Sequence, residues 1–325
     1  MKLVRRQILG LTAGAVTLAA APHKARAESF PVRPVHIVSG FAPGGVGSIA
    51  VRLIGQALEQ RWGRPVVVDH RPGAAGNLAI ETVVTAPPDG YTLMSFGAPA
   101  CINATLYKNL PFDFIRDIAM VASTMSNPLA MVTSPSFEAK SVADFIAYAK
   151  ANLGKINMAS AGNGSTSHLT GELFKARTGI SMLHVPYRGD GPALLDLMAG
   201  QTQVMFDNLI TAIGPIRDGR LRALAVTSAA PWPALPNIPP VADTVPGFEV
   251  SNWIGIGAPR ATPAAIVATL NNAITACLAE PALVARIAEL GAEPMVMSPS
   301  EFDAFVVAET QKWASAVKFS GAKVD

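Results

Sequence analysis

The sequence contains few of the residues from which disulfide frameworks and metal centres are built. Its 325 residues include only two cysteines, Cys101 and Cys277, and their distance in space does not follow from their positions. In an oxidising compartment a disulfide and two buried thiols therefore both stay open. No spacing typical of a structural zinc site occurs among His36, His70, His168 and His184. We expect no metal and no cofactor.

The chain also lacks an uninterrupted apolar run long enough to cross a membrane, which takes about 20 residues. The apolar run Leu9–Ala21 is shorter and follows the paired Arg5 and Arg6. Together with a small-x-small pattern that ends at Ala27, it predicts an export signal over residues 1–27, cleaved near Ala27. The paired arginines favour twin-arginine export, with the general secretory route as the alternative. We therefore expect a periplasmic protein.

Excess positive charge is missing once that signal is set aside. Five of the 26 Lys and Arg residues, and none of the 23 Asp and Glu residues, lie in residues 1–27, so 21 basic and 23 acidic residues remain and the net charge is −2. A nucleic-acid-binding surface needs a basic patch, and the remaining sequence shows none. We expect no nucleic-acid partner.

Short apolar runs alternate with helical patterns along the rest of the chain, which is typical of α/β domains with mainly parallel sheets flanked by helices. The length favours two domains. Two apolar runs meet at Asn127-Pro128 without a helix between them, and the segment Ala229–Gly247 holds six prolines. We interpret both places as crossings between domains. The expected division is domain 1 over 28–127 and 249–325, and domain 2 over 128–248, with the ligand cleft between them.

Two loops rich in glycine each follow a predicted strand and precede a predicted helix. They are GFAPGGVGS (Gly40–Ser48) and SAGNGSTS (Ser160–Ser167). Open α/β sheets bind ligands at this position. Glycine lets successive N–H groups point at an anion beside the positive end of a helix. Each loop is a candidate anion half-site, and the alternative is a plain turn that caps a helix, with Ser48 as an N-cap.

Other chemistries fit these loops less well. A phosphate-binding P-loop needs a lysine that neither loop has, and the dinucleotide motif needs a different glycine spacing. The hydrolase motif Gly-x-Ser-x-Gly is absent, although Ser165 or Ser167 could act as a nucleophile with His168 as its base. A periplasmic Ser/His hydrolase therefore stays an alternative, but no acid that could orient the base follows at a suggestive spacing.

Two further strand ends carry polar side chains. The predicted strand QVMF ends in Asp207-Asn208, and Tyr187 follows the predicted strand MLHVP. Ligands bind outside the carboxyl ends of strands in open α/β sheets, so these side chains are candidates for the same site.

Taken in order, these segments resemble the Bug (Bordetella uptake gene) family of periplasmic solute-binding receptors, which serve tripartite tricarboxylate transporters. The resemblance covers essentially the whole chain after the signal. It rests on VHIVSGFAPGGVGSIAVRLIGQALEQRWGRPVVVDHRPGAAGNLA, PPDGYTL, ASAGNGSTSHLTGELF, HVPYRGDGPALLDLMAGQTQVMFDN, GRLRALAVTS and WIGIGAPRATPAAIVATLN. It implies a two-lobed periplasmic-binding-protein fold of type II (Venus flytrap), with a small organic acid between the lobes.

The resemblance also implies how the acid is held. The two glycine loops would grip a ligand carboxylate through N–H groups, hydroxyls and bridging waters, and Asp207 would lie across the cleft. The ligand-binding residues expected on this basis and from the strand ends are Phe41, Ala42, Pro43, Gly44, Gly45, Ser48, Gly97, Ser160, Ala161, Gly162, Asn163, Gly164, Thr166, Ser167, Tyr187 and Asp207.

The sequence departs from the family's pattern at two places. Many relatives have Asp where this chain has Ser48, so we hypothesise a weaker preference for ligands with an ammonium group and a stronger one for ligands with uncharged or carboxylate-bearing tails. Tight binding of aspartate or glutamate in a calorimetric titration would contradict this. Relatives often have GTNG near the segment SFGAPA, where this chain has Gly97–Pro99, which predicts a less polar cleft wall.

We therefore expect a binding protein rather than an enzyme. It would be a monomer that captures a carboxylate and delivers it to the membrane permease subunits of a tripartite transporter. A receptor that reports to a signalling partner is the alternative. Loop N–H groups recognise little beyond the carboxylate, so dicarboxylates, tricarboxylates, amino acids and aromatic acids all stay open.

Overall fold

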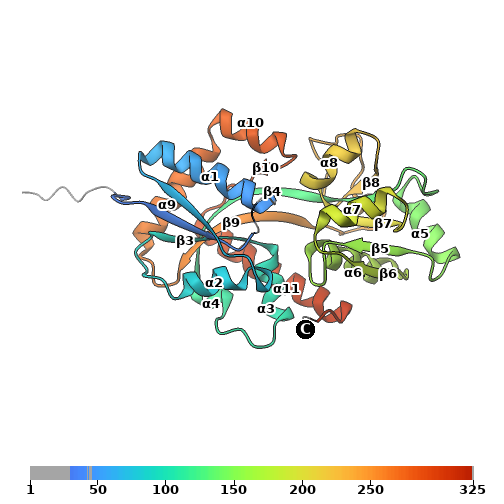
Figure 1. Cartoon of the computed structure of the whole chain (residues 1–325), viewed down its shortest axis with the longest axis horizontal. Coiled ribbons are helices and arrows are strands. Elements are labelled where there is room, and N and C mark those ends of the chain that lie inside the picture. Colours follow the sequence, from blue (N-terminus) through green and yellow to red (C-terminus); the bar gives the residue numbers. More distant parts are fainter. Residues whose placement is uncertain (1–29, 42, 44–45, 324–325) are drawn as a thin grey trace, which may run out of the picture.

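The computed structural model describes residues 30–41, 43 and 46–323, and the predicted export signal lies outside them. Figure 1 shows two lobes side by side, joined by the long strands β4 (Ile118–Thr133) and β9 (Ser251–Pro259). The α/β class predicted from the alternation of strands and helices is confirmed.

The first lobe is built on a sheet with the strand order β2-β1-β3-β9-β4. Strands β1, β2 and β3 are parallel, and β9 runs antiparallel between β3 and β4. The elements are β1 (Val35–Ser39), α1 (Val46–Trp62), β2 (Val66–His70), η1 (Ala74–Gly76), α2 (Asn77–Val84), β3 (Thr92–Gly97), α3 (Ala98–Leu106), α4 (Phe114–Asp117), α9 (Ala264–Leu278), α10 (Pro281–Glu289), β10 (Glu293–Pro294) and α11 (Pro299–Ser320).

The second lobe repeats this plan around β4, β7, β5 and β6. Strands β5, β6 and β7 are parallel, whereas β4 is antiparallel to both β7 and β8. The elements are α5 (Val142–Ala151), β5 (Asn157–Ser160), α6 (Thr166–Thr178), β6 (Leu183–Pro186), α7 (Asp190–Met198), β7 (Val204–Asn208), α8 (Leu209–Arg217), β8 (Arg222–Val226) and η2 (Val241–Asp243).

The crossing at Asn127-Pro128 is one continuous strand rather than the two runs that the sequence suggests. Strand β4 pairs with β9 of the first lobe up to Pro128, and with β7 of the second lobe from Leu129 onward. Proline lacks an N–H group, so it disturbs a sheet least where the pairing partner changes. The domain boundaries expected from the sequence stay a prediction, which this change of partner supports.

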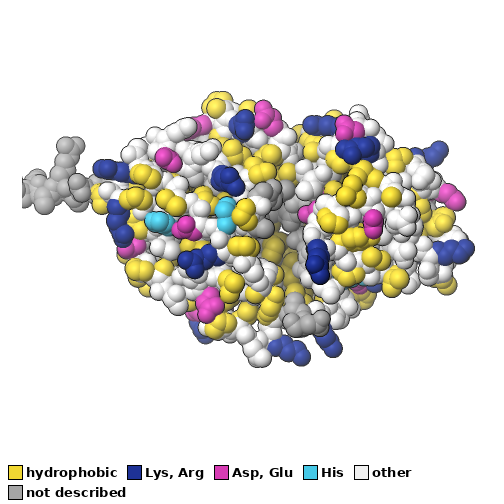
Figure 2. Space-filling model, viewed as in Figure 1, with side chains coloured by type: hydrophobic (Ala, Val, Ile, Leu, Met, Phe, Trp, Pro, Cys, Tyr) yellow, Lys and Arg dark blue, Asp and Glu magenta, His cyan; other side chains and the backbone are white. Residues whose placement is uncertain are grey.

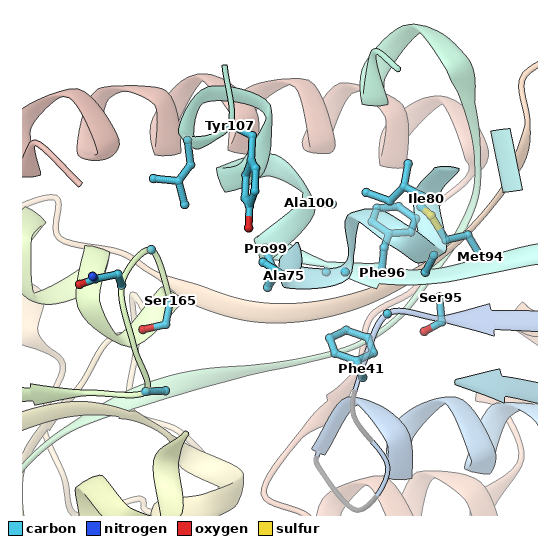
Figure 3. A pocket seen from close by; sticks show the side chains of 18 residues that line it. Phe41, Ala75, Ile80, Met94, Ser95, Phe96, Pro99, Ala100, Tyr107 and Ser165 are labelled. Carbon is cyan, nitrogen blue, oxygen red and sulfur yellow. The ribbon is translucent and has the colours of Figure 1, made fainter. Parts of the chain in front are cut away.

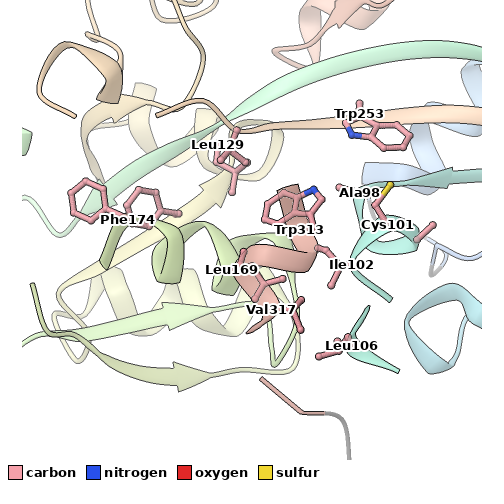
Figure 4. Packing of buried hydrophobic residues seen from close by; sticks show 14 of the residues in the cluster. Ala98, Cys101, Ile102, Leu106, Leu129, Leu169, Phe174, Trp253, Trp313 and Val317 are labelled. Atoms are coloured by element: carbon pink, nitrogen blue, oxygen red, sulfur yellow. The ribbon is translucent and has the colours of Figure 1, made fainter. Parts of the chain in front are cut away.

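The C-terminal helix α11 packs against both lobes. Trp313 is wholly buried, and Val317 is nearly so, in a cluster that includes Leu106 of α3 and Leu169 of α6. Figure 4 shows these side chains together between the two lobes. Contact between the lobes therefore does not depend on the two crossing strands alone.

Both cysteines are free and buried, so the two-thiol alternative is the correct one. They lie in different hydrophobic clusters. Burial raises the pKa of Cys101 to about 12 and that of Cys277 to about 11. Their thiols therefore stay protonated and unreactive near neutral pH.

Within the described residues, no single helix is long and apolar enough to cross a membrane. Only when α9 and α10 are taken together do they reach the length and apolar composition of a membrane span within the described residues. The two helices are bent by 74° relative to each other.

Candidate functional site

Two adjoining cavities lie between the lobes, where Figure 2 shows a groove in the surface. We call the cavity of about 500 Å³ the apolar chamber and the cavity of about 520 Å³ the hinge chamber. Phe41, Pro99, Ala161 and Ser165 line both, so the two chambers adjoin at these residues.

Each chamber has its own lining. The remaining residues of the apolar chamber are Gly40, Ala75, Gly76, Ala79, Ile80, Met94, Ser95, Phe96, Gly97, Ala100, Leu106, Tyr107, Asn163 and Gly164. Figure 3 shows Phe41, Phe96, Met94 and Ile80 gathered around one end of it. The remaining residues of the hinge chamber are Gly47, Asn127, Leu129, Thr166, Ser167, Gly189, Asp190, Gly191, Asn208, Thr211, Asn252, Trp253 and Ile254.

The second glycine loop connects β5 to α6 and forms part of both chambers. Ser165 is the N-cap of α6, because its side chain accepts a hydrogen bond of 3.2 Å from the N–H of His168. Gly162 and Gly164 have φ of 130° and 73°, a region that favours glycine. A Cβ atom on Gly164 would lie 2.3 Å from Cδ2 of Leu106, so this loop closely approaches the first lobe.

Several N–H groups of this loop are already bonded within the protein. Gly162 donates to Ser160 Oγ at 3.1 Å, Gly164 donates to His168 Nδ1 at 3.1 Å, and Ser165 donates to the carbonyl of Gly162 at 3.1 Å. These bonds hold the loop in shape, and the same groups are not available to a ligand.

The first turn of α6 presents donors that have no acceptor among the described residues. The N–H groups of Thr166 and Ser167 precede the first intrahelical bonds. The hydroxyl of Ser167 is buried without a partner, and both residues line the hinge chamber. Two N–H groups and a hydroxyl at the positive end of a helix form a site suited to an anion. We call this group the α6 cup.

Two histidines support the loop from behind. His168 Nδ1 accepts from Gly164, and His184 Nε2 lies 2.6 Å from Ser160 Oγ. Burial is the main cause that lowers the pKa of His168 to about 3 and that of His184 to about 4, and the charge of Lys175 lowers both further. Both rings are therefore neutral near pH 7. His168 serves as an acceptor, and the two rings pack against each other.

This arrangement does not form the nucleophile and base considered from the sequence. Ser165 Oγ bonds the backbone N–H of His168 and not its ring, and the Nδ1 of that ring is occupied by Gly164. Ser160 does contact the ring of His184, but Ser160 is fully buried and lines neither chamber. A substrate in the cleft would not reach it.

The first glycine loop is described only in part. Ala42, Gly44 and Gly45 lie outside the described residues, and Pro43 lines neither chamber. Phe41 lines both, and its carbonyl lies 3.0 Å from Nδ1 of His70. Ser48 lies within the first turn of α1 rather than at its N-cap, because the helix begins at Val46.

Ser48 faces away from the chambers. It is fully buried, and its Oγ lies 3.2 Å from His70 Nε2 and accepts from Arg52 at 3.3 Å. Through His70, the last residue of β2, Ser48 links the start of α1 to that strand.

Two carboxyl groups lie together on the second lobe. Asp190, at the start of α7, lines the hinge chamber, and Asp207, at the end of β7, is fully buried beside it. Burial, together with the neighbouring Asp190, raises the pKa of Asp207 well above its usual value, and burial also raises the pKa of Asp190. Thr211 donates to Oδ2 of Asp207 at 2.8 Å. The pair therefore holds a proton more readily than two exposed carboxylates do, and carries less negative charge.

The structure brings together part of the predicted set. Phe41, Gly97, Ala161, Asn163, Gly164, Thr166 and Ser167 line the chambers, whereas Pro43, Ser48, Ser160, Gly162, Tyr187 and Asp207 do not. The hydroxyl of Tyr187 donates to Asp196 at 2.7 Å, and burial raises the pKa of Tyr187 to about 12. These last residues support the walls.

Sequence reasoning missed the hinge residues and most of the apolar wall. Asn127 of β4 lies opposite Asn252 of β9 and donates to Asn208 at 2.7 Å. The Asn127-Pro128 junction in the sequence does point to a hinge at Asn127. Nothing in the pattern distinguished Ile80 or Met94 from ordinary core residues.

Two α/β lobes joined by crossing strands, with a ligand-sized cavity between them, define the two-lobed periplasmic-binding-protein fold of type II. The chain matches the model of the tripartite tricarboxylate transporter family receptor over residues 50–321, and it belongs to this family. It is therefore a solute-binding receptor of the tripartite tricarboxylate type.

Individual relatives agree with this membership and confirm the resemblance to Bug proteins. BugT of Bordetella pertussis (strain Tohama I) is 34% identical over 301 residues, which cover 92% of each chain. Rpa4515 of R. palustris, solved with adipate, is 35% identical, with a TM-score of 0.81 over 91% of this chain and 100% of that one. The periplasmic binding protein BugD is 32% identical, with a TM-score of 0.78 over 90% and 99% of the two chains.

Proposed function

We propose that this receptor binds an organic carboxylate between its lobes, with the carboxylate at the α6 cup, and performs no chemistry on it. The observation that carries this proposal is the buried hydroxyl of Ser167, a residue that lines the hinge chamber, which has no partner among the described residues. A buried hydroxyl without a partner is costly, so a ligand oxygen that accepts from it stabilises the complex.

The charges around the α6 cup also favour an anion, which backbone dipoles would hold. The N–H groups of Thr166 and Ser167 add to the partial positive charge at the start of α6, which is a 13-residue helix. The proton-sharing pair of Asp190 and Asp207 repels an anion less than two free carboxylates would. The related Rpa4515 was solved with adipate, which is also an organic carboxylate.

Closure of the lobes would complete the site. The chambers have walls on both lobes and on the hinge strands, so a ligand in them touches all three. We place the hinge at the boundaries 127/128 and 248/249. The ligand favours the closed form because it contacts both lobes only there.

We further propose that the protein acts in the periplasm as a monomer, after removal of residues 1–27, and docks on the membrane permease subunits of a tripartite transporter. BugD, a periplasmic binding protein, and the receptor family both support this location.

The experiment that tests carboxylate binding compares each acid of a panel with its neutral amide in a thermal-shift assay. A ligand stabilises the protein by about 2.7 kcal/mol at a hundredfold excess over Kd. We expect at least one acid to raise the melting temperature and its amide to have no effect. If no acid does so, or if amides work equally well, the carboxylate assignment is wrong.

A further inference from the structure

The described residues of the cleft include few charged side chains. Among the described residues that line either chamber, Asp190 is the only one with an acidic side chain, and none is a lysine or an arginine. Ala42, Gly44 and Gly45, which lie outside the described residues, carry no charged side chain either. Uncharged donors, such as the α6 cup and the amide side chains that line the hinge chamber, are therefore what can balance a ligand's negative charge there.

This balance limits how many carboxylates the ligand can carry. One carboxylate at the α6 cup is matched by the N–H groups of Thr166 and Ser167 and by a hydroxyl. A second or third carboxylate, moved out of water into the apolar chamber, would find no cation and a wall made mostly of hydrocarbon. Polar di- and tricarboxylates are disfavoured for this reason.

The apolar chamber indicates what the rest of the ligand is. Its wall consists mostly of hydrocarbon, including Ile80, Met94 and Phe96, and its polar side chains are uncharged. Because the chamber joins the hinge chamber at Ala161 and Ser165, a group attached to a carboxylate at the α6 cup can extend into it. Apolar surface of the ligand gains free energy when it leaves water for such a wall.

Ser95 is one of the polar residues in this wall. The residue is 1% exposed, and its hydroxyl has no partner among the described residues. A hydroxyl or carbonyl substituent on the ligand would satisfy it, and the cost of leaving it unpaired would then disappear.

We propose that the receptor is selective for monocarboxylic acids whose body is an apolar ring or branched hydrocarbon, held in the apolar chamber, with Ser95 contacting a polar substituent. This inference rests on the proposed function and narrows its ligand class. The ligand class proposed for this chain differs from adipate, the acid in the Rpa4515 structure, because adipate carries two carboxylates.

The test is isothermal titration of the full mature chain with benzoate, 4-hydroxybenzoate, cyclohexanecarboxylate, malate, citrate and benzamide. We expect the three ring acids to bind at least about tenfold more tightly than malate or citrate, and benzamide not to bind. Tighter binding of malate or citrate would overturn the inference while leaving the proposed function intact. Binding of no acid at all would contradict both.

Substitutions in the apolar chamber test whether it is responsible for the selectivity for ring acids. Ala100→Leu places a larger side chain in the apolar chamber, and the matched control Ala268→Leu adds the same side chain at an exposed site on α9. We expect Ala100→Leu to weaken benzoate binding at least about tenfold while propionate, which needs only the α6 cup, binds as before. Equal benzoate affinity in Ala100→Leu and Ala268→Leu would overturn the assignment of the chamber.

Ser95→Ala tests the polar contact separately. The ratio of 4-hydroxybenzoate to benzoate affinity should fall about tenfold in this variant, and an unchanged ratio would contradict a role for Ser95.

Discussion

The imidazole rings of His168 and His184 lie stacked, with centroids 3.7 Å apart and planes 6° from parallel. One ring accepts from the N–H of Gly164, and the other contacts the hydroxyl of Ser160. The two rings thus hold both ends of the second glycine loop. Because the α6 cup begins where this loop ends, the histidine pair sets the position of the donors that we assign to the ligand.

The histidine pair predicts a loss of stability in weak acid. Both pKa values are lowered on folding, to about 3 for His168 and about 4 for His184, from a usual value of 6.5. The unfolded chain therefore binds more protons between about pH 6.5 and pH 4, and the free energy of unfolding falls as the pH falls through that window. The slope is at most about 1.4 kcal/mol per pH unit for each histidine.

Urea unfolding of His168→Asn from pH 7 to pH 4 measures this effect. Asparagine keeps an acceptor for Gly164 but does not titrate, so we expect a shallower slope than in the unmodified protein. His36→Asn is the control, because the side chain of His36 is 46% exposed. If His168→Asn and His36→Asn have the same slope, the neutral buried pair is not responsible.

Gly164 lies so close to Leu106 that a methyl group added at Gly164 is expected to push the two lobes apart. Gly164→Ala combines a positive φ of 73° with a Cβ atom 2.3 Å from Leu106 Cδ2. Gly154→Ala is matched in backbone, with φ of 76°, and has no atom within 4 Å of the new Cβ. We expect Gly164→Ala to cost about 1–2 kcal/mol more than Gly154→Ala in denaturant unfolding.

Ligand binding provides a second measurement for this pair. Gly164→Ala should also weaken carboxylate binding, and the double change Gly164→Ala with Leu106→Ala should restore part of it, because the clash is removed. Equal effects of Gly164→Ala and Gly154→Ala on both measurements would show that the loop does not depend on this contact.

The two glycine loops and their flanking elements could be predicted from the sequence because the signals are local. Gly40–Ser48 and Ser160–Ser167 both carry turn-forming glycines, so their place between strand and helix follows from neighbouring residues. The apolar chamber could not be predicted, because its wall combines β3, α2 and α3 with the tip of the second loop. A buried Met94 that faces a cavity and one that faces a packed core look alike in sequence.

Polar side chains show the same limit. Ser48, Ser160 and Asp207 belong to the predicted ligand-binding set, but in this structure each is fully buried and lines neither chamber. Their partners lie 22, 24 and 4 residues away along the chain. Whether a polar group at a strand end faces a cleft or a supporting contact depends on those partners, which only the fold brings together.

The carboxyl pair predicts a stabilising substitution. Asp207 is fully buried with a raised pKa, so the charge it acquires as the pH rises destabilises the folded protein. Asp207→Asn removes that ionisation and keeps an acceptor for Thr211. We expect the gain in free energy of unfolding to grow from pH 5 to pH 8 and to reach about 1 kcal/mol or more.

Denaturant unfolding at both pH values checks this, with Asp218→Asn as the control. The carboxyl group of Asp218 is 61% exposed, so its substitution should change stability little at either pH. A loss of stability in Asp207→Asn at pH 8 would mean that the ionised carboxylate of Asp207 has a partner that stabilises it.

The central claim is that a ligand carboxylate lies at the first turn of α6, and a pair of serine substitutions tests it most directly. Ser167 and Ser300 are both the second residue of their helices, but Ser167 lines the hinge chamber whereas Ser300 is exposed on α11. An aspartate suits either helix start, yet at position 167 it places a negative charge where the carboxylate would bind.

Isothermal titration of both variants with an acid that the unmodified protein binds is the decisive measurement. We predict that Ser167→Asp abolishes binding, Ser167→Ala weakens it about tenfold, and Ser300→Asp leaves it unchanged. Undiminished binding of the acid by a folded Ser167→Asp protein would contradict the account.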